Sequence, residues 1–348
     1  MPHSPLFQRR RFLQYSSLAL TGALFSACRS QNDTGDTAET STSELDRVTY
    51  GTNWYAQAEH GGFYQAVATG IYEQYGLDVT IEMGGPQVNG TQLLMSGVLD
   101  FYMSSGADAI RAVAEGIPKV TVAAIFQKDP QILLAHPDTG VDDLADLKGR
   151  PIYISASANT TYWPLLKAKY GFTDDQKRPY NFTIGPFLAD KQVAQQGYLS
   201  SEPLKVEQEG GFEPVVLLLA DYGYNPYSTT IETRREIVEQ NPDLVQRFVK
   251  ASIAGWYSYF ENPEPGNQLI QAANPEMRDE QLAYGLAKMQ EYDLVLSGET
   301  KELGIGAMTA ERWQTFFESM VAAGVYAADV DYTQAFTLEF VNQGQPAL

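Results

Sequence analysis

Residues 47–83 read RVTYGTNWYAQAEHGGFYQAVATGIYEQYGLDVTIEM, and this stretch decides the fold. Residues 47–54 are predicted to form a strand. Residues 61–75 carry apolar side chains at helical spacing and predict an amphipathic helix, and residues 77–83 predict a second strand. A strand, a helix and a second strand in this order form a βαβ unit, which indicates a sheet covered by helices.

The alternation of short strands and helices continues to about residue 135 and restarts after the turn signals at 136–140. A β-branched stretch at 228–232 is predicted to return the chain to the first unit, and helices dominate after residue 242. The sequence therefore predicts an α/β fold of two lobes, in which two open sheets are flanked by helices and two chain crossings form a hinge. Ligands of such sheets bind beyond the carboxyl ends of the strands. We expect a signal peptide at 1–27, a flexible tether at 28–46, a first lobe at 47–135, a second lobe at 136–225, and the return to the first lobe with C-terminal helices at 226–348.

The first 27 residues have the features of a processed export signal. Arg9, Arg10 and Arg11 precede an apolar run that ends in small residues just before Cys28. This run is shorter than the roughly 20 apolar residues that a membrane-spanning helix needs. The arginines resemble a twin-arginine signal, and the general secretory route stays open as an alternative.

Cys28 is the only cysteine of the chain and lies where a signal peptidase would cut. Residues 24–28, LFSAC, resemble a bacterial lipobox, which implies that Cys28 is acylated and becomes the first mature residue. The alternative is a buried or free thiol. Residues 29–45 have almost no apolar side chains and predict a flexible tether, because they cannot bury enough surface to offset the entropy of ordering. We therefore expect an exported protein, periplasmic or at the cell surface, that a lipid anchors to a membrane.

Composition excludes several classes of function. The 24 Lys and Arg against 43 Asp and Glu give a net charge of −19, which repels the phosphate backbone of nucleic acids. A single cysteine excludes an internal disulfide and a thiolate metal cluster, and no His or Cys pair stands at metal-ligand spacing. The sequence contains no GxSxG, HExxH or GxxxxGK motif. We therefore expect no catalytic residues, no metal and no cofactor.

Five short segments carry a resemblance to a known family. They are Asn53-Trp54 with His60, GIY at 70–72, YGLDV at 75–79, LMSGVLDF at 94–101 and DLKGR at 146–150. They resemble the NMT1/THI5-like and SsuA-like family of substrate-binding proteins of ABC importers. The resemblance implies a type II-like periplasmic-binding-protein fold, a monomer, and delivery of a small-molecule ligand to permease and ATPase subunits.

The resemblance also narrows the ligand. Asn-Trp, with Glu59-His60 six residues on, is the pattern of binders of thiamine pyrimidine precursors, so we expect a small flat heterocycle of that type. Riboflavin, nitrate and sulfonate are alternatives within the same family. The family also contains a thiamine pyrimidine synthase, but the chain has no counterpart of the cysteine-rich iron motif of that enzyme, and Thr69 stands in place of its lysine. We therefore expect binding without chemistry.

Candidate ligand-binding residues follow from the predicted elements and from the resemblance. Trp54 can stack on a flat heterocycle or be a core aromatic. Ser104 and Ser105 precede a helix, where hydroxyls and amides can bind a polar group or simply cap the helix. Glu202 can accept two parallel hydrogen bonds from an aminopyrimidine edge, or can be a surface acid. The predicted ligand-binding residues are Asn53, Trp54, His60, Ser104, Ser105, Ser157, Asn159, Thr160, Glu202 and Tyr222. We expect ligand capture by closure of the two lobes about the hinge.

Overall fold

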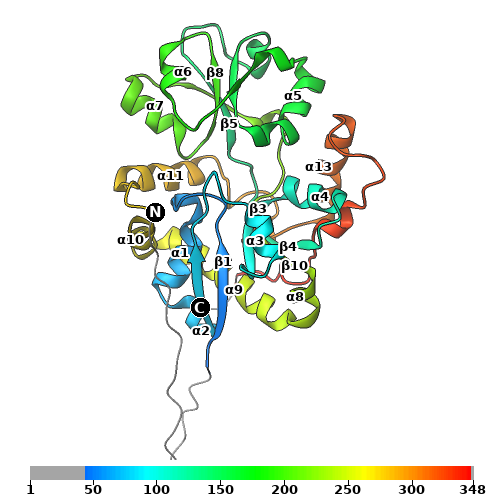
Figure 1. Ribbon diagram of the computed structural model, residues 1–348. Helices are drawn as coiled ribbons and strands as arrows, with labels where there is room; N and C mark the ends of the chain where they lie inside the picture. Colours follow the sequence, from blue (N-terminus) through cyan, green and yellow to red (C-terminus); the bar gives the residue numbers. More distant parts are fainter. Residues whose placement is uncertain (1–43, 346–348) are drawn as a thin grey trace, which may run out of the picture. The chain divides into compact units, whose positions relative to one another are not determined.

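A computed structural model describes residues 44–345 of the chain (Figure 1). The predicted signal peptide, the predicted lipidation site Cys28 and most of the predicted tether lie outside these residues. The tether was expected to extend to residue 46, but Asp46 begins the first strand. It pairs with Leu77 of the second strand, so ordered sheet structure begins one residue earlier than predicted.

The first sheet has the strand order β2-β1-β3-β10-β4. Its strands are β1 (Asp46–Gly51), β2 (Leu77–Glu82), β3 (Phe101–Ser105), β4 (Lys119–Phe126) and β10 (Ser228–Arg234). Strand β1 is parallel to β2 and β3, whereas β10 is antiparallel to both of its neighbours. All eight residues of β4 are buried, which is typical of a strand covered on both faces.

The second sheet repeats this pattern with the order β7-β6-β8-β5-β9. Its strands are β5 (Gln131–Ala135), β6 (Ile152–Ile154), β7 (Lys177–Pro179), β8 (Ala194–Tyr198) and β9 (Val215–Leu218). In each sheet the antiparallel strand in fourth place comes directly after a crossing between the sheets. The predicted division at 135/136 therefore falls one strand too late, because β5 pairs with β8 and β9.

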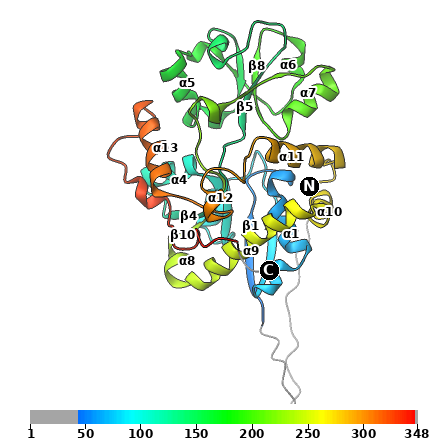
Figure 2. The same ribbon diagram turned by 180° about the vertical axis from the view of Figure 1, so that it is seen from behind.

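Helices cover both sheets, and Figures 1 and 2 show them from opposite sides. Those after the first strands are α1 (Gly61–Ala68), α2 (Ile71–Gln74), α3 (Gly90–Met95) and α4 (Gly106–Ala114). Those among the strands of the second sheet are α5 (Trp163–Tyr170), α6 (Gly185–Ala189) and α7 (Glu202–Gly210). The C-terminal helices are α8 (Arg235–Gln240), α9 (Pro242–Glu261), α10 (Glu264–Ala273), α11 (Asp279–Glu291), α12 (Thr300–Leu303) and α13 (Ala310–Ala322). Within residues 44–345, none of these helices combines the length and the apolar character needed to cross a bilayer.

Short 3-10 helices complete the described chain. They are η1 (Ala58–His60), η2 (Leu144–Leu147), η3 (Ala156–Thr160), η4 (Asp174–Gln176), η5 (Leu219–Tyr222) and η6 (Tyr332–Ala335). The helix predicted at 61–75 is divided into α1 and α2 by Gly70, whose φ of +71° lies in the left-handed region that favours glycine. The break turns the chain so that Ile71 and Tyr72 remain buried.

Helix α9 fixes α1 against the first sheet. Phe248 of α9 stacks on Phe101 of β3 with ring centroids 4.0 Å apart. A side chain at Gly255 would lie 2.3 Å from the carbonyl oxygen of Gly62, so the glycine permits a backbone approach that no other residue would allow. Because α1 is held in this way, its N-terminal end, with the preceding His60, keeps a fixed place at the edge of the sheet.

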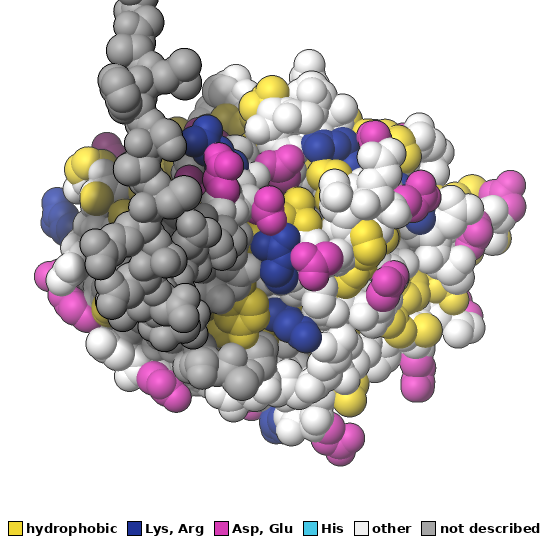
Figure 3. Space-filling view, turned by 90° about the horizontal axis from the view of Figure 1, so that it is seen from below, with side chains coloured by type: hydrophobic (Ala, Val, Ile, Leu, Met, Phe, Trp, Pro, Cys, Tyr) yellow, Lys and Arg dark blue, Asp and Glu magenta, His cyan; other side chains and the backbone are white. Residues whose placement is uncertain are grey.

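The surface agrees with the acidic composition. On the face seen in Figure 3, Asp and Glu side chains are scattered, and Lys and Arg side chains stand among them. An excess of acidic groups spread in this way mainly keeps a protein soluble.

Candidate functional site

A cavity of about 280 Å³ lies where the carboxyl ends of strands from both sheets converge. We call it the inner cavity. From the first sheet it is lined by the residues that follow β1 and by the end of β3, and from the second by the residues that follow β6 and β8. This is where open α/β sheets present ligand contacts, because the loops after parallel strands meet at one edge.

Seven of the ten predicted ligand-binding residues line this cavity. They are Asn53, Trp54, His60, Ser104, Ser105, Ser157 and Glu202. They come from both lobes and from positions up to 149 residues apart, between Asn53 and Glu202. The structure therefore places these seven side chains around one space, and their roles as ligand contacts remain a prediction.

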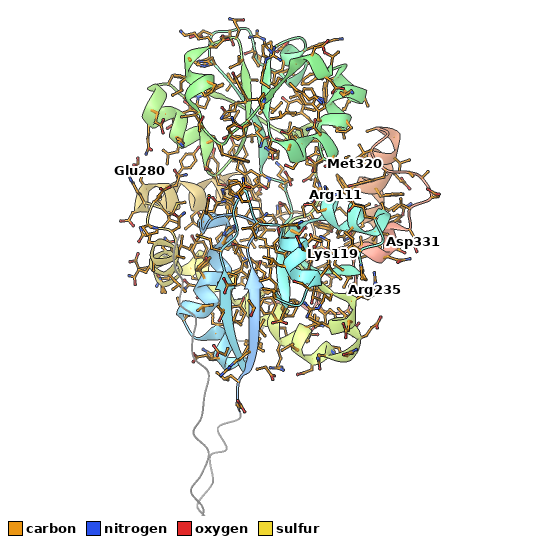
Figure 4. The ribbon with its side chains drawn as sticks, in the orientation of Figure 1. Arg111, Lys119, Arg235, Glu280, Met320 and Asp331 are labelled. Atoms are coloured by element: carbon orange, nitrogen blue, oxygen red, sulfur yellow. The ribbon has the colours of Figure 1, made fainter. Side chains whose placement is uncertain are left out.

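The other three predicted residues lie outside the inner cavity. Asn159 and Thr160 are exposed at the end of η3 and line a separate surface groove with Arg111, which is labelled in Figure 4. The side-chain oxygen of Asn159 accepts from Lys177 at 2.9 Å, which holds it away from the cavity. Tyr222 ends η5 and is not part of the lining of the inner cavity; its carbonyl oxygen accepts hydrogen bonds from Lys169 at 2.7 Å and from the hydroxyl of Tyr170 at 3.3 Å.

Two buried carboxylates that were not among the predicted ligand-binding residues also line the cavity. Glu59 is 3% exposed and accepts a hydrogen bond from the hydroxyl of Ser200, and burial raises its pKa to about 7. Asp129 is 5% exposed and accepts from the backbone of Gln131 at 3.0 Å, and burial likewise raises its pKa to about 7. Within the described residues neither forms an ion pair. A sequence signal existed for Asp129, which lies three residues after the end of the buried strand β4.

Glu202 is already engaged with its own lobe. One carboxylate oxygen accepts from the backbone N–H of Tyr198 at 2.7 Å, and the other accepts from the hydroxyl of Tyr180 at 3.2 Å. Burial raises the pKa of Glu202, and the hydrogen bond from the backbone of Tyr198 opposes this rise. Since each oxygen has a second lone pair, the carboxylate can still accept from a ligand in the position that these two bonds fix.

Asp108 is the fourth carboxylate of the lining. It lies in the first turn of α4, where Ser105 caps the helix, and it pairs with Arg111 at 2.6 Å. The inner cavity thus has four carboxylates, and among its described lining residues there is no Lys or Arg. Its carboxylates offer hydrogen-bond acceptors, while its hydroxyl and amide side chains can both donate and accept.

His60 is fully buried at the start of α1, and burial lowers its pKa to about 3. The imidazole is therefore neutral at physiological pH and can offer both a donor and an acceptor nitrogen. Its Nδ1 has no hydrogen-bond partner among the described residues. A buried polar atom without a partner costs about 1–3 kcal/mol, so a ligand that supplies the partner gains this energy.

Aromatic side chains from both lobes enclose the cavity. Trp54 of the first lobe and Phe182 of the second lie with ring centroids 4.9 Å apart and their planes at 48°. Phe182 also contacts Tyr180 at 5.1 Å and adopts a φ of 58°, a conformation that is strained for a residue other than glycine. Tyr162 and Tyr224, which also line the cavity, meet edge to face at 5.8 Å. A flat ring that stacks on one of these aromatic side chains would gain about 0.5–1.5 kcal/mol beyond the burial of its area.

The two crossings between the sheets are tied to each other beside the cavity. The side chain of Asn225 in the second crossing accepts from the backbone N–H of Asp129 in the first, at 3.1 Å. Lys128 and Asp221 form an ion pair across the same two segments at 2.9 Å. Such paired crossings are the hinge that the fold requires, and Asp129 itself belongs both to the hinge and to the cavity lining.

Comparisons with known proteins agree with this architecture. The family model described as NMT1/THI5 like matches residues 57–265. The chain is 29% identical over 309 residues to the riboflavin-binding protein RibY of Chloroflexus aurantiacus, a match that covers 86% of this chain and 87% of that protein. It is 25% identical to the formylaminopyrimidine-binding protein of Halalkalibacterium halodurans, over 82% of this chain and 89% of that protein.

A solved structure shows the same fold. The periplasmic aliphatic sulphonate binding protein SsuA from Escherichia coli matches with a TM-score of 0.62 at 17% identity, over 83% of this chain and 91% of that chain. This likeness confirms the predicted two-lobed periplasmic-binding-protein fold.

Proposed function

Because the chain belongs to the NMT1/THI5-like family, we propose that it is the solute-binding subunit of an ABC importer. In this proposal the protein is exported, is anchored to a membrane through a lipid on Cys28, and hands its ligand to permease and ATPase subunits. The export signal and the lipobox resemblance at residues 1–28 support the location. The two relatives named above, both binding proteins that match over most of the chain, support capture of a small molecule.

The ligand is a flat nitrogen heterocycle that is neutral or cationic and carries hydrogen-bond donors. The observation that carries this proposal is the lining of the inner cavity, which has four carboxylates, no described Lys or Arg, and aromatic rings from both lobes. A carboxylate such as Glu202 can accept from the amino group of an aminopyrimidine, and the rings can stack on its faces. A sulfonate or nitrate would find no Lys or Arg in the described lining to pair with, which disfavours both anions.

Thiamine pyrimidine precursors fit this chemistry, and riboflavin is the second candidate. Riboflavin offers an N–H group and several hydroxyl donors on a planar ring system, and the likeness to RibY over most of the chain favours it. Both ligands would use the same acceptors and the same aromatic walls.

Binding without chemistry is preferred to pyrimidine synthesis. Pyridoxal phosphate requires a lysine for its Schiff base, and the described lining of the inner cavity contains none. Thr69, at the position where the family enzyme has a lysine, lies exposed at the end of α1 and outside this lining.

A binding screen tests the proposal. The protein is mixed in turn with 4-amino-5-hydroxymethyl-2-methylpyrimidine, its formylamino relative, riboflavin, nitrate and an alkanesulfonate, and thermal unfolding is followed. A ligand at about 100 times its Kd should add about 2.7 kcal/mol to the stability. Stabilisation by the anions alone would refute the proposed ligand class, and turnover of a bound heterocycle would refute binding without chemistry.

A matched pair of variants locates the binding. Glu202→Gln should weaken binding of the stabilising heterocycle by about 10-fold or more, since a hydrogen bond to a charged group contributes about 1.5–3 kcal/mol. Glu207→Gln, an exposed change on the same helix α7 and outside the inner cavity, should leave affinity unchanged. Equal affinities for the two variants would show that the ligand does not contact Glu202.

A further inference from the structure

Gln196 of β8 lies in the wall of the inner cavity, and the protein holds only one end of its side-chain amide. The oxygen Oε1 accepts from the backbone N–H of Ser155 at 2.5 Å and from the hydroxyl of Tyr162 at 2.9 Å. A backbone N–H can only donate, so the amide atom that it meets has to be the oxygen and not the nitrogen. These two hydrogen bonds therefore fix the orientation of the amide.

The amide nitrogen of Gln196, Nε2, is left for a ligand. Within residues 44–345 no hydrogen bond engages this atom. Gln196 is 8% exposed, and its Nε2 is not among the described polar atoms that are both sealed from solvent and without a partner. The nitrogen therefore keeps a small accessible surface, and the space that Gln196 lines is the inner cavity. Its two N–H donors are available there.

Strand β8 places this side chain firmly. Side chains alternate between the two faces of a strand, and Gln196 and Tyr198 line the inner cavity while Gln195 does not and is fully buried. Strand β8 lies between β6 and β5, and Gln196 pairs with Leu133 of β5. The amide thus projects from the interior of a sheet, where a binding group is held more precisely than on a loop.

The neighbouring polar groups do not offer the same donors. The Nε2 atom of Gln131, another amide in the lining, donates to the carbonyl oxygen of Gly197 at 2.7 Å. The ionised carboxylate of Glu202 only accepts, and the backbone N–H of Tyr198 holds it at the end of β8 at 2.7 Å. The second lobe therefore presents a fixed donor group beside a fixed acceptor group. A ligand that pairs with both has to carry an acceptor atom as well as a donor.

We propose that Gln196 determines ligand specificity in the second lobe, by donating through Nε2 to an acceptor atom of the heterocycle, either a ring nitrogen or a carbonyl oxygen. Tyr162 and the backbone of Ser155 are positioning groups, because they hold the amide oxygen. The inference rests on the proposed function, since it takes the inner cavity as the ligand site. A ligand without the acceptor would leave a buried donor unpaired, and sites built to form a hydrogen bond reject such ligands strongly.

Gln196→Glu tests the donor. The new carboxylate can still accept from Ser155 and Tyr162, while an acceptor oxygen replaces the amide nitrogen. The full chain is titrated at pH 8 with 4-amino-5-hydroxymethyl-2-methylpyrimidine and with riboflavin. The Kd of the heterocycle that binds the wild type should rise at least about fivefold, as expected for one lost hydrogen bond. Gln192→Glu adds the same charge at an exposed position before β8, outside the cavity lining, and should leave the Kd unchanged.

A spectroscopic measurement on the wild type follows the amide nitrogen directly. In protein labelled with the heavy nitrogen isotope at glutamine, the pair of side-chain proton signals that is missing from Gln196→Glu belongs to Gln196. Gln196→Asn serves for this assignment if Gln196→Glu does not fold. Saturation with the heterocycle should move one signal of the pair downfield and slow its exchange with water. Signals that keep their position and exchange rate would overturn the inference.

Tyr162→Phe tests the positioning. The change releases one of the two hydrogen bonds on the amide oxygen, so the Kd should rise about two- to threefold. In a Gln196→Glu background the donor is already absent, and the same change should have no further effect. An equal loss in both backgrounds would contradict the positioning role of Tyr162.

The outcomes separate this inference from the proposed function. If a heterocycle binds the wild type and Gln196→Glu with equal affinity, the role of Gln196 is wrong while the proposed function stands. If no heterocycle binds the wild type, the proposed function fails, and the inference fails with it.

Discussion

The two buried carboxylates of the inner cavity should make the free protein less stable as the pH rises. Glu59 has a pKa raised by burial from 4.5 to about 7, and Asp129 from 3.8 to about 7. In the unfolded chain both groups release their protons at a lower pH than in the folded protein. Their contribution to stability is therefore fully present below about pH 4 and is lost as the pH rises to about 7.

The size of the effect follows from these pKa values. A tenfold change in proton affinity corresponds to about 1.4 kcal/mol, so the rise for Glu59 is equivalent to about 3 kcal/mol and that for Asp129 to about 4 kcal/mol. Both side chains are at least 95% buried, so screening by solvent reduces these values little. Each is a large fraction of the 5–15 kcal/mol that stabilises a typical domain.

Urea unfolding of the wild type and of Glu59→Gln between pH 4.5 and 8 measures the contribution of Glu59. The Gln side chain keeps an oxygen that can accept from Ser200, while it cannot ionise. The free energy of unfolding of the wild type, minus that of the variant, should fall by about 3 kcal/mol over this range. The exposed Glu73→Gln provides a control in which the difference should stay flat. A flat difference for Glu59→Gln as well would refute the reasoning.

Two further changes test the core of the first lobe. Lys119→Met should lower the free energy of unfolding by about 3–5 kcal/mol, because Lys119 and Glu232 form a buried ion pair at 2.5 Å, and adding Glu232→Gln should restore most of the loss in urea unfolding. Failure of the second change to restore stability would contradict the ion-pair explanation. Gly255→Ala should cost about 1–3 kcal/mol, since its new Cβ would lie 2.3 Å from the carbonyl oxygen of Gly62, whereas Gly185→Ala meets nothing within 4 Å. Thermal unfolding should show a lower Tm for Gly255→Ala alone.

The fold class could be predicted from local patterns because the alternation of strands and helices is visible in the sequence. The predictions were wrong where pairing with a strand far away in the sequence determines the sheet to which a segment belongs. Strand β5 was assigned to the first lobe from its place in the chain, yet Ile132 lies between Gly197 and Leu218 of the second sheet. No feature within residues 131–135 identifies those partners. The helix at 61–75 was extended through Gly70 because its apolar spacing continues past the turn.

In the candidate site, too, the sequence predicted residues that local patterns mark, and missed those whose position depends on contacts far away in the sequence. Residues at strand ends, such as Asn53 and Ser104, could be found from the predicted strands and from the resemblance. Ser157 and Asn159 belong to one short segment, but only Ser157 lines the inner cavity, because the side chain of Asn159 is held by Lys177. Glu59 was named with His60 in the family pattern but was not predicted as a ligand contact, because its burial becomes visible only when η1 and Ser200 are brought together.

The place of β10 in the first sheet has a consequence for how the protein is made. Strand β10 lies between β3 and β4 and joins them through antiparallel pairing along its length. A ribosome that has translated as far as Tyr227 has produced both flanking strands, but not the strand that connects them. The second sheet, in contrast, is already complete at Leu218. A chain that stops before Ser228 would therefore contain an intact second sheet and a first sheet divided in two.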